Sequence, residues 1–369
     1  MAYTTIDDPS AYFHIQLYTG NNLTTQTITN NANAGDFQAD WLWIKNRDDV
    51  EQHHLMDSNR GANKFLHSNS TDDEREGSYN GGHNDINAFG SNGFTITSNG
   101  SGDELNFGTR LYVAWQWKAN GGTTTTNDAS ATGVGNQDST HQANTTSGFS
   151  IVTYSPPSNQ VGTMAHGLGA VPHVMIVKCR STDGERWEVY HHKNTSAPET
   201  DQLGLSETDA TVDSTHTWND TSPTSTIFTV GSSGATNEVS KTYVAYLFTE
   251  IQGYSKFGSY TGNFNSDGTF VYTGFKPAFL ILKNIDDSGS TANWYMFDNK
   301  RDTDNVVQNI IHPNANDAAS DSAVCDFLSN GFKFRTADNA WNGNGDDYIY
   351  IAFAEHPFVS SGGVPVTAR

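Results

Sequence analysis

The feature that most constrains this chain is an internal repeat, because a short apolar run closed by a lysine occurs three times. The copies are Asp40–Asn46, Pro172–Lys178 and Pro277–Asn284. Each run has the length of a buried strand and is too short for an ordinary helix, and a proline opens two of them. In the third copy a Gly- and Ser-containing turn leads to the aromatic run Trp294–Asp298, which predicts a β-hairpin.

Two further landmarks recur in the same order around this hairpin. A strand that ends at a tyrosine and a turn precedes it at Tyr12–Gly20, Phe149–Pro156 and Lys256–Gly262, and a closing strand follows it at Tyr112–Trp115, Tyr243–Tyr246 and Tyr348–Phe353. Alternation along the first closing strand places Val113 and Trp115 on one face, and Tyr112 and Ala114 on the other. Both faces are apolar, so this strand is predicted to lie between two packed layers.

The landmarks divide the chain into units of about a hundred residues, the usual size of a domain. We place the repeats at residues 1–120, 148–254 and 255–358, with a C-terminal tail at 359–369. Residues 121–147 lengthen the gap after the first copy and are rich in Gly, Thr and Asn, so we expect a linker or long surface loop there. The predicted fold class is all-β, with three tandem β-sandwich domains of jelly-roll type.

Finer matches lie inside the repeats. Ser-Asn-Gly stands between aromatic residues at 91–93 and again at 329–331, which predicts tight hairpin turns, whereas the middle copy has only a looser version. Asp57 and Asp298 recur at one repeat position, where we expect them to cap a turn, and His191 takes that position in the middle copy.

Composition excludes several partners. The chain of 369 residues has a net charge of −21 and no cluster of Lys or Arg, so we expect neither nucleic-acid binding nor attraction to an anionic membrane. The chain shows no signal peptide and no apolar stretch of membrane-spanning length, which predicts synthesis in a cytoplasm without membrane insertion. Cys179 and Cys325 are expected to be buried free thiols.

Metal ligands are scarce. The pairs His53-His54 and His191-His192 would point to opposite faces of a strand, so we expect surface or strand-edge histidines. Residues 263–268 partly match a calcium loop, but Gly274 stands where a bidentate Glu is needed, and a β-turn is favoured. The acidic residues at 72–76 and 346–347 are expected to be solvated loop charges. No cofactor is predicted, with weak Ca²⁺ binding at the acidic loops as the alternative.

Catalytic candidates are equally few. The carboxylates of Glu51, Asp57, Asp298 and Glu355 could serve glycoside hydrolysis only in pairs, and nothing in the sequence brings two together. The chain lacks G-x-S-x-G, H-E-x-x-H and phosphate-loop motifs, so no catalytic residue is predicted.

The remaining candidates are tryptophans. Trp187 and Trp294 share one repeat position and are expected in the core, whereas Trp341 lies in a polar segment and is the candidate exposed aromatic residue for stacking on a sugar.

Several of these segments resemble repeats in virion structural proteins of tailed bacteriophages, especially marine ones. They are Ala2–Tyr12, Asp40–Arg47, Phe89–Phe94, Tyr112–Lys118, Tyr260–Gly262 and Phe275–Phe279. The resemblance covers nearly the whole chain apart from the Thr/Asn-rich tract and the last ten residues. It implies a tail-fibre, receptor-binding or head-decoration protein built of β-sandwiches, located in the virion, and it offers no catalytic motif.

The preferred hypothesis is therefore a non-enzymatic phage virion protein that attaches the particle to its host or decorates its capsid or tail. Its expected partners are other virion proteins, a glycan of the host surface and further copies of itself in a homotrimer. The alternative is a carbohydrate-active protein, either a lectin or a polysaccharide depolymerase.

Overall fold

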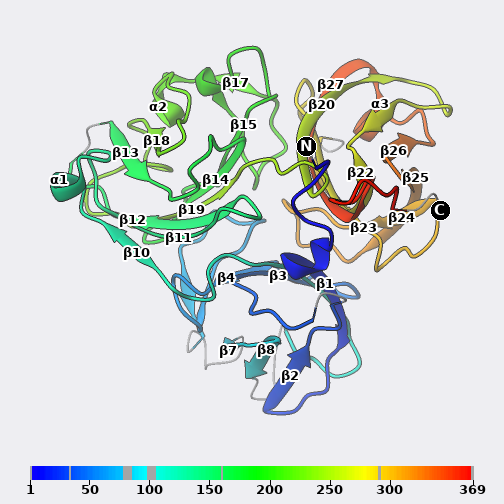
Figure 1. The fold of residues 1–369 in the computed structure, drawn as a ribbon, viewed down its shortest axis with the longest axis horizontal. Helices are drawn as coiled ribbons and strands as arrows, with labels where there is room; N and C mark the ends of the chain where they lie inside the picture. The colour runs from blue at the N-terminus through cyan, green and yellow to red at the C-terminus, as the bar shows by residue number, and fades with distance from the viewer. Residues whose placement is uncertain are drawn as a thin grey trace.

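The computed structural model describes residues 2–32, 35–77, 85–97, 105–158, 161–289 and 292–366, and its strands form antiparallel sheets gathered in three groups (Figure 1). The α-helices of the described residues are the single turns α1 (Ala129–Thr132), α2 (Thr215–Trp218) and α3 (Asn339–Asn342). In the same part of the chain, 3₁₀ turns lie at Pro9–Ala11 and Pro198–Thr200. The predicted all-β class is confirmed.

The first unit is a sandwich of two sheets. The larger sheet has the order β1-β9-β3-β4 and the smaller one β2-β8-β7, while β5 and β6 form a separate pair. The bounds are β1 (Phe13–Thr19), β2 (Thr25–Thr29), β3 (Trp41–Asn46), β4 (His54–Asp57), β5 (Lys64–Phe65), β6 (Arg75–Glu76), β7 (Asp85–Gly90), β8 (Gly93–Thr97) and β9 (Leu111–Trp117). Buried side chains from both sheets, among them Ile44, Phe94 and Tyr112, form the core between them.

The third unit has the same plan. Its sheets have the orders β20-β27-β22-β23 and β21-β26-β25-β24, and a core that includes Leu280, Phe332 and Tyr348 lies between them. The bounds are β20 (Ser255–Asn263), β21 (Phe270–Tyr272), β22 (Phe275–Asn284), β23 (Trp294–Asp298), β24 (Val307–Ile310), β25 (Ser320–Leu328), β26 (Gly331–Phe334) and β27 (Asn344–Pro357).

The second unit repeats the four-strand order as β12-β19-β14-β15, but β10 and β11 extend this sheet to six strands. Strands β13 and β18 pair on its other side, and β16 and β17 form a short ribbon. The bounds are β10 (Thr125–Asn127), β11 (Ser139–Asn144), β12 (Phe149–Tyr154), β13 (Gly162–Ala165), β14 (Val174–Cys179), β15 (Glu188–His191), β16 (Asp201–Gln202), β17 (Val212–Asp213), β18 (Ile227–Val230) and β19 (Tyr243–Phe248).

Strands β10 and β11 correct the expectation of a linker or long loop at 121–147. The tract is ordered through hydrogen bonds, because β11 pairs with β12 along its length and β10 pairs with β11. Gln142 on β11 is fully buried, and its Oε1 accepts hydrogen bonds from the backbone N–H groups of Asn120 and Gly122. A tract poor in large apolar residues can thus join a sheet when its polar groups are satisfied there.

The predicted Ser-Asn-Gly turns are confirmed at both positions. Ser91-Asn92 joins β7 to β8, and Ser329-Asn330 joins β25 to β26. The glycine after each turn lies against the neighbouring strand. A Cβ at Gly93 would lie 2.0 Å from the carbonyl oxygen of Ile28, and a Cβ at Gly331 would lie 2.0 Å from that of Val271.

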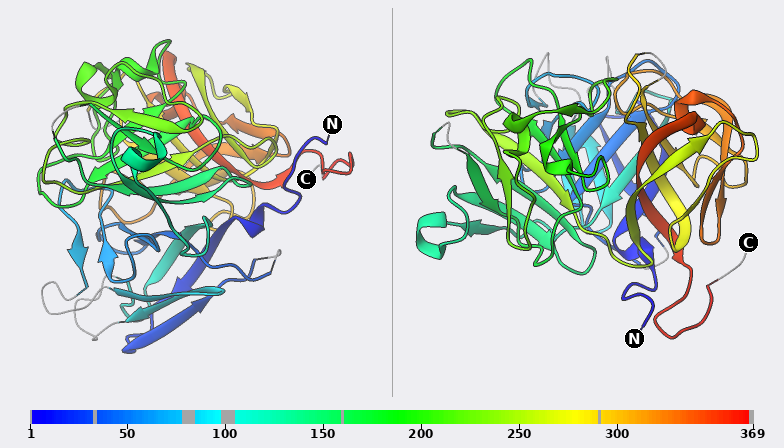
Figure 2. Two further views of the ribbon diagram at one scale, coloured as in Figure 1. Left: turned by 60° about the vertical axis from the view of Figure 1, so that its left-hand side comes forward. Right: turned by 90° about the horizontal axis from the view of Figure 1, so that it is seen from above.

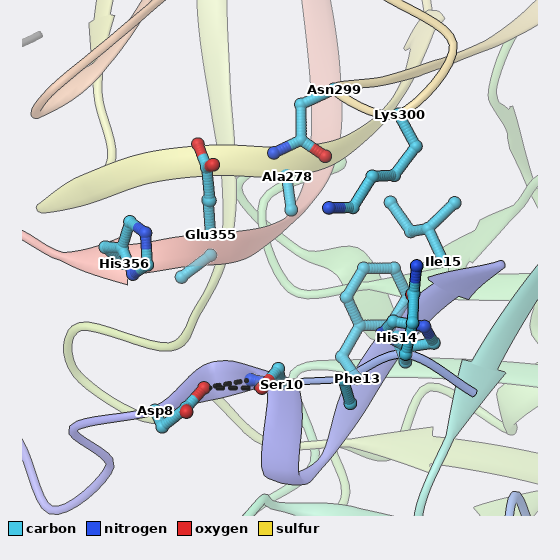
Figure 3. A pocket seen from close by; sticks show the side chains of 13 residues that line it. Asp8, Ser10, Phe13, His14, Ile15, Ala278, Asn299, Lys300, Glu355 and His356 are labelled. Atoms are coloured by element: carbon cyan, nitrogen blue, oxygen red, sulfur yellow. Dashed lines mark hydrogen bonds between the residues drawn. The ribbon is translucent and has the colours of Figure 1, made fainter. Parts of the chain in front are cut away.

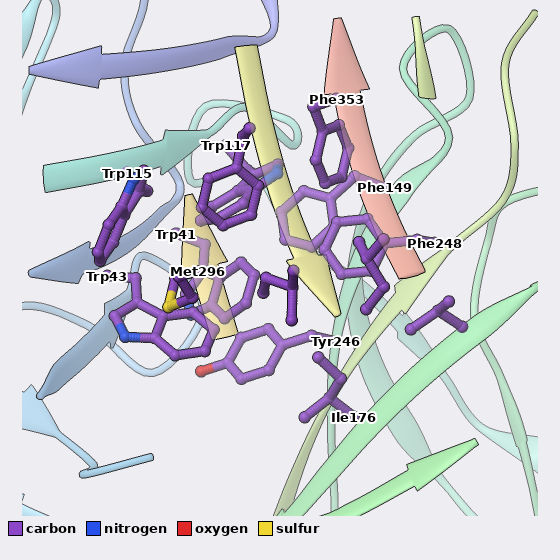
Figure 4. Packing of buried hydrophobic residues seen from close by; sticks show 14 of the residues in the cluster. Trp41, Trp43, Trp115, Trp117, Phe149, Ile176, Tyr246, Phe248, Met296 and Phe353 are labelled. Atoms are coloured by element: carbon purple, nitrogen blue, oxygen red, sulfur yellow. The ribbon is translucent and has the colours of Figure 1, made fainter. Parts of the chain in front are cut away.

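The large sheets of all three units turn their outer faces toward one another and share one core (Figure 4). The closing strands β9, β19 and β27 show this most clearly. Val113 and Trp115 lie in the shared core, whereas Tyr112 and Ala114 lie in the core of the first sandwich, as the alternation predicted.

Aromatic rings from different units are in direct contact in the shared core. Trp41 of the first unit stacks on Tyr246 of the second, with ring centroids 4.3 Å apart. Phe13 of the first unit stacks on Phe353 of the third, with centroids 5.1 Å apart. Trp41 and Phe353 are each about 2% exposed or less, so the side chains that meet between units are as fully buried as those in the core of each unit.

One hydrogen bond recurs at each of the three junctions and closes a ring. The donors, which share one repeat position, are the ring nitrogens of His53, Trp187 and Trp294, and the acceptors are the carbonyl oxygens of His312, His67 and Gly204. The distances are 3.0, 2.8 and 2.8 Å. The first unit therefore bonds to the third, the third to the second and the second to the first, which is the closed heterologous arrangement of a cyclic trimer within one chain.

A second ring consists of backbone hydrogen bonds. The N–H groups of Glu74, Thr211 and Ala319 donate to the carbonyl oxygens of Arg180, Ile285 and Arg47, at 2.8, 2.9 and 2.9 Å. Donor and acceptor again belong to neighbouring units around the ring. The six hydrogen bonds of the two rings fix how the units are oriented relative to one another, because the apolar contacts of the shared core have no preferred direction.

The two ends of the described chain meet beside the third unit (Figure 2). Residues after β27 fold back on themselves through a bridge between Val359 and Pro365. The backbone N–H of Ser361 donates to the Asp7 carboxylate at 2.6 Å, and Tyr3 Oη donates to the carbonyl oxygen of Gly274 at 2.7 Å.

Replacing Trp41 tests whether the units share one core. We expect Trp41→Ala to destabilise the protein by about 3–5 kcal/mol and to speed amide hydrogen exchange in β19 and β27 as well as in β3, because its cavity opens between units. Trp218→Ala is the matched control, since Trp218 lies only in the sandwich core of the second unit. Exchange changes confined to the first unit in Trp41→Ala would mean that the units are stable independently.

Candidate functional site

Trp341, the candidate exposed aromatic residue, is buried, which corrects the expectation of a sugar-stacking ring. It is 5% exposed, on α3, and meets Tyr295 edge to face with centroids 5.0 Å apart. The Asp338 carboxylate caps α3 by accepting from the N–H of Ala340, and this turn directs the indole inward. The polar neighbours of Trp341 are explained by capping and do not indicate exposure.

The histidine pairs lie at edge strands, as expected, but they are more buried than expected. His53 and His54 are fully buried and His191 is 1% exposed. Because Nε2 of His53 faces a carbonyl oxygen and must donate, its Nδ1 accepts the indole N–H of Trp43 at 2.8 Å. Burial, with the Lys45 charge nearby, holds the pKa of His53 well below its ordinary value, so this ring is a neutral member of the junction.

The repeated aspartates cap turns, as expected. Asp57 Oδ1 accepts the N–H of Arg60 at 2.8 Å, and Asp298 Oδ1 accepts that of Arg301 at 2.8 Å. The other carboxylate oxygen of each forms a buried ion pair with the same arginine. Each aspartate also accepts a bond from a neighbouring unit: Asp57 from Tyr246 Oη at 2.7 Å and Asp298 from Trp115 Nε1 at 3.1 Å. The hydrogen bonds and ion pairs at the junctions therefore occupy both carboxylates.

The acidic residues at 72–76 are not simply solvated. Glu74 bridges Arg60 of its own unit and Arg180 of the second unit, at 2.8 Å to each. Burial opposes ionisation of Glu74, but its hydrogen bonds to Arg180 and the two arginine charges outweigh burial and lower its pKa to about 2. The structure turns one residue of this run into a clamp between units.

The partial calcium loop at 263–268 is a turn, as favoured. Asn263 Oδ1 and Asn265 Oδ1 accept the N–H groups of Asn265 and Asp267, and the Asp267 carboxylate pairs with Lys333 at 2.5 Å. Within the described residues, no group of three or more His, Cys, Asp or Glu side chains is placed to hold a metal ion. Cys179 and Cys325 are buried free thiols, as expected.

All three repeated lysines are buried, and Lys178 and Lys283 lie at junctions. Lys178 Nζ donates to the carbonyl oxygen of Thr71 at 3.1 Å, and Lys283 Nζ donates to that of Ala292 at 2.8 Å and of Thr208 at 3.4 Å. Burial lowers the pKa of each to about 8. Their donor groups are occupied by carbonyl oxygens, which indicates a role in joining units.

One surface available to a ligand is a polar groove on the third unit, which we name the Glu355 groove. Its volume is about 470 Å³, and its lining residues are Lys276, Asn299, Asp302, Thr303, Asp304, Asn305, Val307, Phe327, Glu355 and His356. A smaller hollow of about 70 Å³ adjoins it and shares Asn299, Glu355 and His356 (Figure 3). Asp8, Ser10 and His14 of the first unit line the far side of this hollow.

The wall of the Glu355 groove is held by its own side chains. Asp302 accepts the N–H groups of Gln308 and Asn309 at 2.9 and 2.7 Å, and Asn305 exchanges two hydrogen bonds with the backbone of Phe327. Lys276 pairs with Glu355 across the floor at 2.6 Å. The groove therefore presents both hydrogen-bond donors and acceptors, which suits a ligand rich in hydroxyl groups.

Sequence reasoning selected Glu355 but missed the run Asp302–Asn305 that forms the wall. The available signal was an Asp/Asn cluster directly after the capped turn, at a place where the repeats differ. Composition alone cannot separate such a wall from an ordinary loop. Its anchorage to β25 through Phe327 depends on tertiary contact.

Fold and site together define an all-β protein of three fused sandwiches whose charged and aromatic repeat residues join the units. The chain belongs to the family described as a domain of unknown function, DUF7483, whose model matches residues 8–357. That match spans all three units. No curated protein matches the chain. No solved structure matches it either. None of the helices in the described part of the chain is long and apolar enough to cross a membrane.

Acid should remove the contribution of the Glu74 clamp. The folded-state pKa of about 2 lies below the ordinary value of 4.5, so this stabilisation is complete above about pH 4.5 and is lost as pH falls toward 2. We expect Glu74→Gln to lower the free energy of unfolding at pH 7 by roughly 2–3 kcal/mol, and to lower it far less near pH 2.5, in urea titrations.

Glu76→Gln is the control, because Glu76 belongs to the same acidic run but its side chain is 67% exposed. A pH-independent effect of Glu74→Gln would contradict the assignment of the clamp.

Proposed function

We propose that this protein is a non-enzymatic structural component of a phage virion, serving as a tail-fibre, receptor-binding or head- or tail-decoration protein. The observation that carries the proposal is that the candidate residues with reactive or sugar-stacking side chains are buried. Asp57, His53, Trp341 and the lysines are buried, and the junction groups among them bond from one unit to the next. Such a body suits a rigid adhesion or shell module, and the resemblance of its repeats to virion proteins supports the same role.

The ring of three units bears on the proposed assembly. A homotrimer of single sandwiches would close through heterologous contacts of this kind, and here one chain supplies all three. The proposed homotrimer of whole chains must therefore use other surfaces. Such surfaces include Phe270 and Tyr272 on the edge strand β21, which are 44% and 54% exposed.

The virion assignment is tested on purified particles. We expect antibodies against this chain to label intact particles at the tail or on the shell in electron micrographs, and mass spectrometry to find the chain in gradient-purified virions. Recovery of the chain only in the unassembled fraction of an infected lysate would contradict the proposal. Label at the tail tip would favour receptor binding, and label over the shell would favour decoration.

The alternative is carbohydrate binding, and the Glu355 groove is the specific observation that favours it. Thr303 and Asp304 in its wall are exposed, so their side chains can exchange water for sugar hydroxyls. An enzyme needs two carboxyl groups at a defined separation across a bond. Two of the three groove carboxylates, those of Asp302 and Glu355, are engaged with protein groups, which leaves only the exposed Asp304. We therefore infer binding without hydrolysis at this surface.

The groove is tested with the double substitution Thr303→Ala and Asp304→Ala, because both side chains are exposed and removing them leaves the core intact. We expect retention on immobilised host-surface polysaccharide to fall by about five-fold or more, since one or two hydrogen bonds are lost. Asp213→Ala on β17 is the matched exposed control. Equal retention of both variants would place recognition elsewhere, and shortening of the polysaccharide would establish a depolymerase.

A further inference from the structure

The junction between the first and second units contains a closed charge clamp. Arg60 Nη1 donates to Glu74 Oε2 at 2.8 Å, and Arg180 donates through Nε and Nη2 to the two oxygens of the same carboxylate at 2.9 and 2.8 Å. Arg60 is held in place by Asp57 and by the carbonyl oxygen of Leu55. One carboxylate thus satisfies two arginines from different units.

The junction between the first and third units has both arginines in equivalent places. Arg301 Nε pairs with Asp298 and its Nη2 donates to the carbonyl oxygen of Met296 at 3.1 Å, which repeats the bonds of Arg60. Arg47 stands where Arg180 stands, because its carbonyl oxygen accepts the same ring hydrogen bond. The donor of that bond is Ala319, so an alanine occupies the position of Glu74.

The missing carboxylate leaves donors without acceptors. Arg301 Nη1 and Arg47 Nε are buried and have no hydrogen-bond partner among the described residues, and the Arg301 side chain is fully buried. Burial, followed by the Arg301 charge, lowers the pKa of Arg47, while Asp298, Asp48 and Asp302 act in the opposite direction. These two guanidinium nitrogens therefore have no carboxylate as a hydrogen-bond acceptor among the described residues.

We propose that a small carboxylate anion binds between Arg47 and Arg301 beside Ala319, where the Glu74 carboxylate lies at the equivalent junction. Bidentate recognition by planar guanidinium groups fits a carboxylate. Arg47 and Ala319 are half-buried, so the site is reachable from solvent. The anion comes either from solution or from an acidic side chain of a partner. This inference does not depend on the proposed virion role.

The third junction supplies an internal control. At the junction between the second and third units, Asn194 stands three residues after His191, the position that Arg60 has in the first unit. Thr211 takes the place of Glu74, and Ile285 takes the place of Arg180. A carboxylate placed at Thr211 would meet neither arginine. Any anion effect that depends on Ala319 and has no counterpart at Thr211 therefore belongs to the arginine pair.

The test is thermal unfolding of the full chain in sodium formate at constant ionic strength. We expect saturating formate to raise the unfolding midpoint of the native sequence by about 2 °C, because the anion binds only the folded state. Ala319→Glu should raise the midpoint without formate and abolish the response to it, since the chain then carries its own carboxylate. Thr211→Glu should lower the midpoint and leave the formate response unchanged.

A converse variant keeps the test independent of that substitution. Glu74→Ala should leave Arg60 and Arg180 without their carboxylate and lower the midpoint. It should also give about twice the formate response of the native sequence, so that formate restores part of the loss. An acetylated Asp-containing peptide added in place of formate separates the two sources. A response to the peptide assigns a partner's side chain, and a response to formate alone assigns a free ion. Equal formate responses of the native sequence and Ala319→Glu would overturn the proposal, because the arginines would then be satisfied by water.

Discussion

The structure depends on a hydrogen bond made three times, from the ring nitrogen of His53, Trp187 or Trp294 to a carbonyl oxygen of the next unit. Each sandwich exposes an apolar outer face on its large sheet, and such a face is stable only when covered. Mutual covering by three sheets removes that surface from water, but apolar contact has no direction. The ring of buried donors fixes which unit meets which, because a misaligned junction would leave polar groups unpaired.

The three repeats carry different residues at equivalent positions of their junctions. The Asp-Arg cap survives at Asp57 and Asp298, while His191 replaces it in the second unit and bonds to the carbonyl oxygen of Tyr350 at 3.1 Å. The three junctions therefore carry different charges on one backbone plan. Buried ion pairs contribute little net stability when complete, but breaking one is costly, so these differences discourage the wrong pairing of units. Divergence on the outside instead produces the Glu355 groove, which is lined from the third unit alone.

Much of the fold could be predicted because strand alternation records burial directly. Tyr112–Trp117 carries large apolar side chains on both faces, and the structure places each face in a different core. Local signals also sufficed for the Ser-Asn-Gly turns and the capping aspartates. Residues 121–147 were missed because a polar strand that pairs at an edge lacks an apolar pattern. Trp341 is buried where exposure was expected, because its neighbours in the sequence are polar while its neighbours in space are Tyr295 and the core of the third unit.

The sequence by itself determined the all-β class, the repeat and the identity of the buried strands, since these follow from alternation and turn chemistry within a few residues. Only the tertiary structure decided that the three units share a core and that their repeated polar residues bond across junctions. It also decided that the backbone of Ala319 bonds to Arg47 as that of Glu74 bonds to Arg180 at the equivalent junction. These facts join residues far apart in the chain, and no local pattern encodes which surfaces meet. Their physical reason is the burial of apolar sheet faces, which brings distant polar groups together and obliges them to pair.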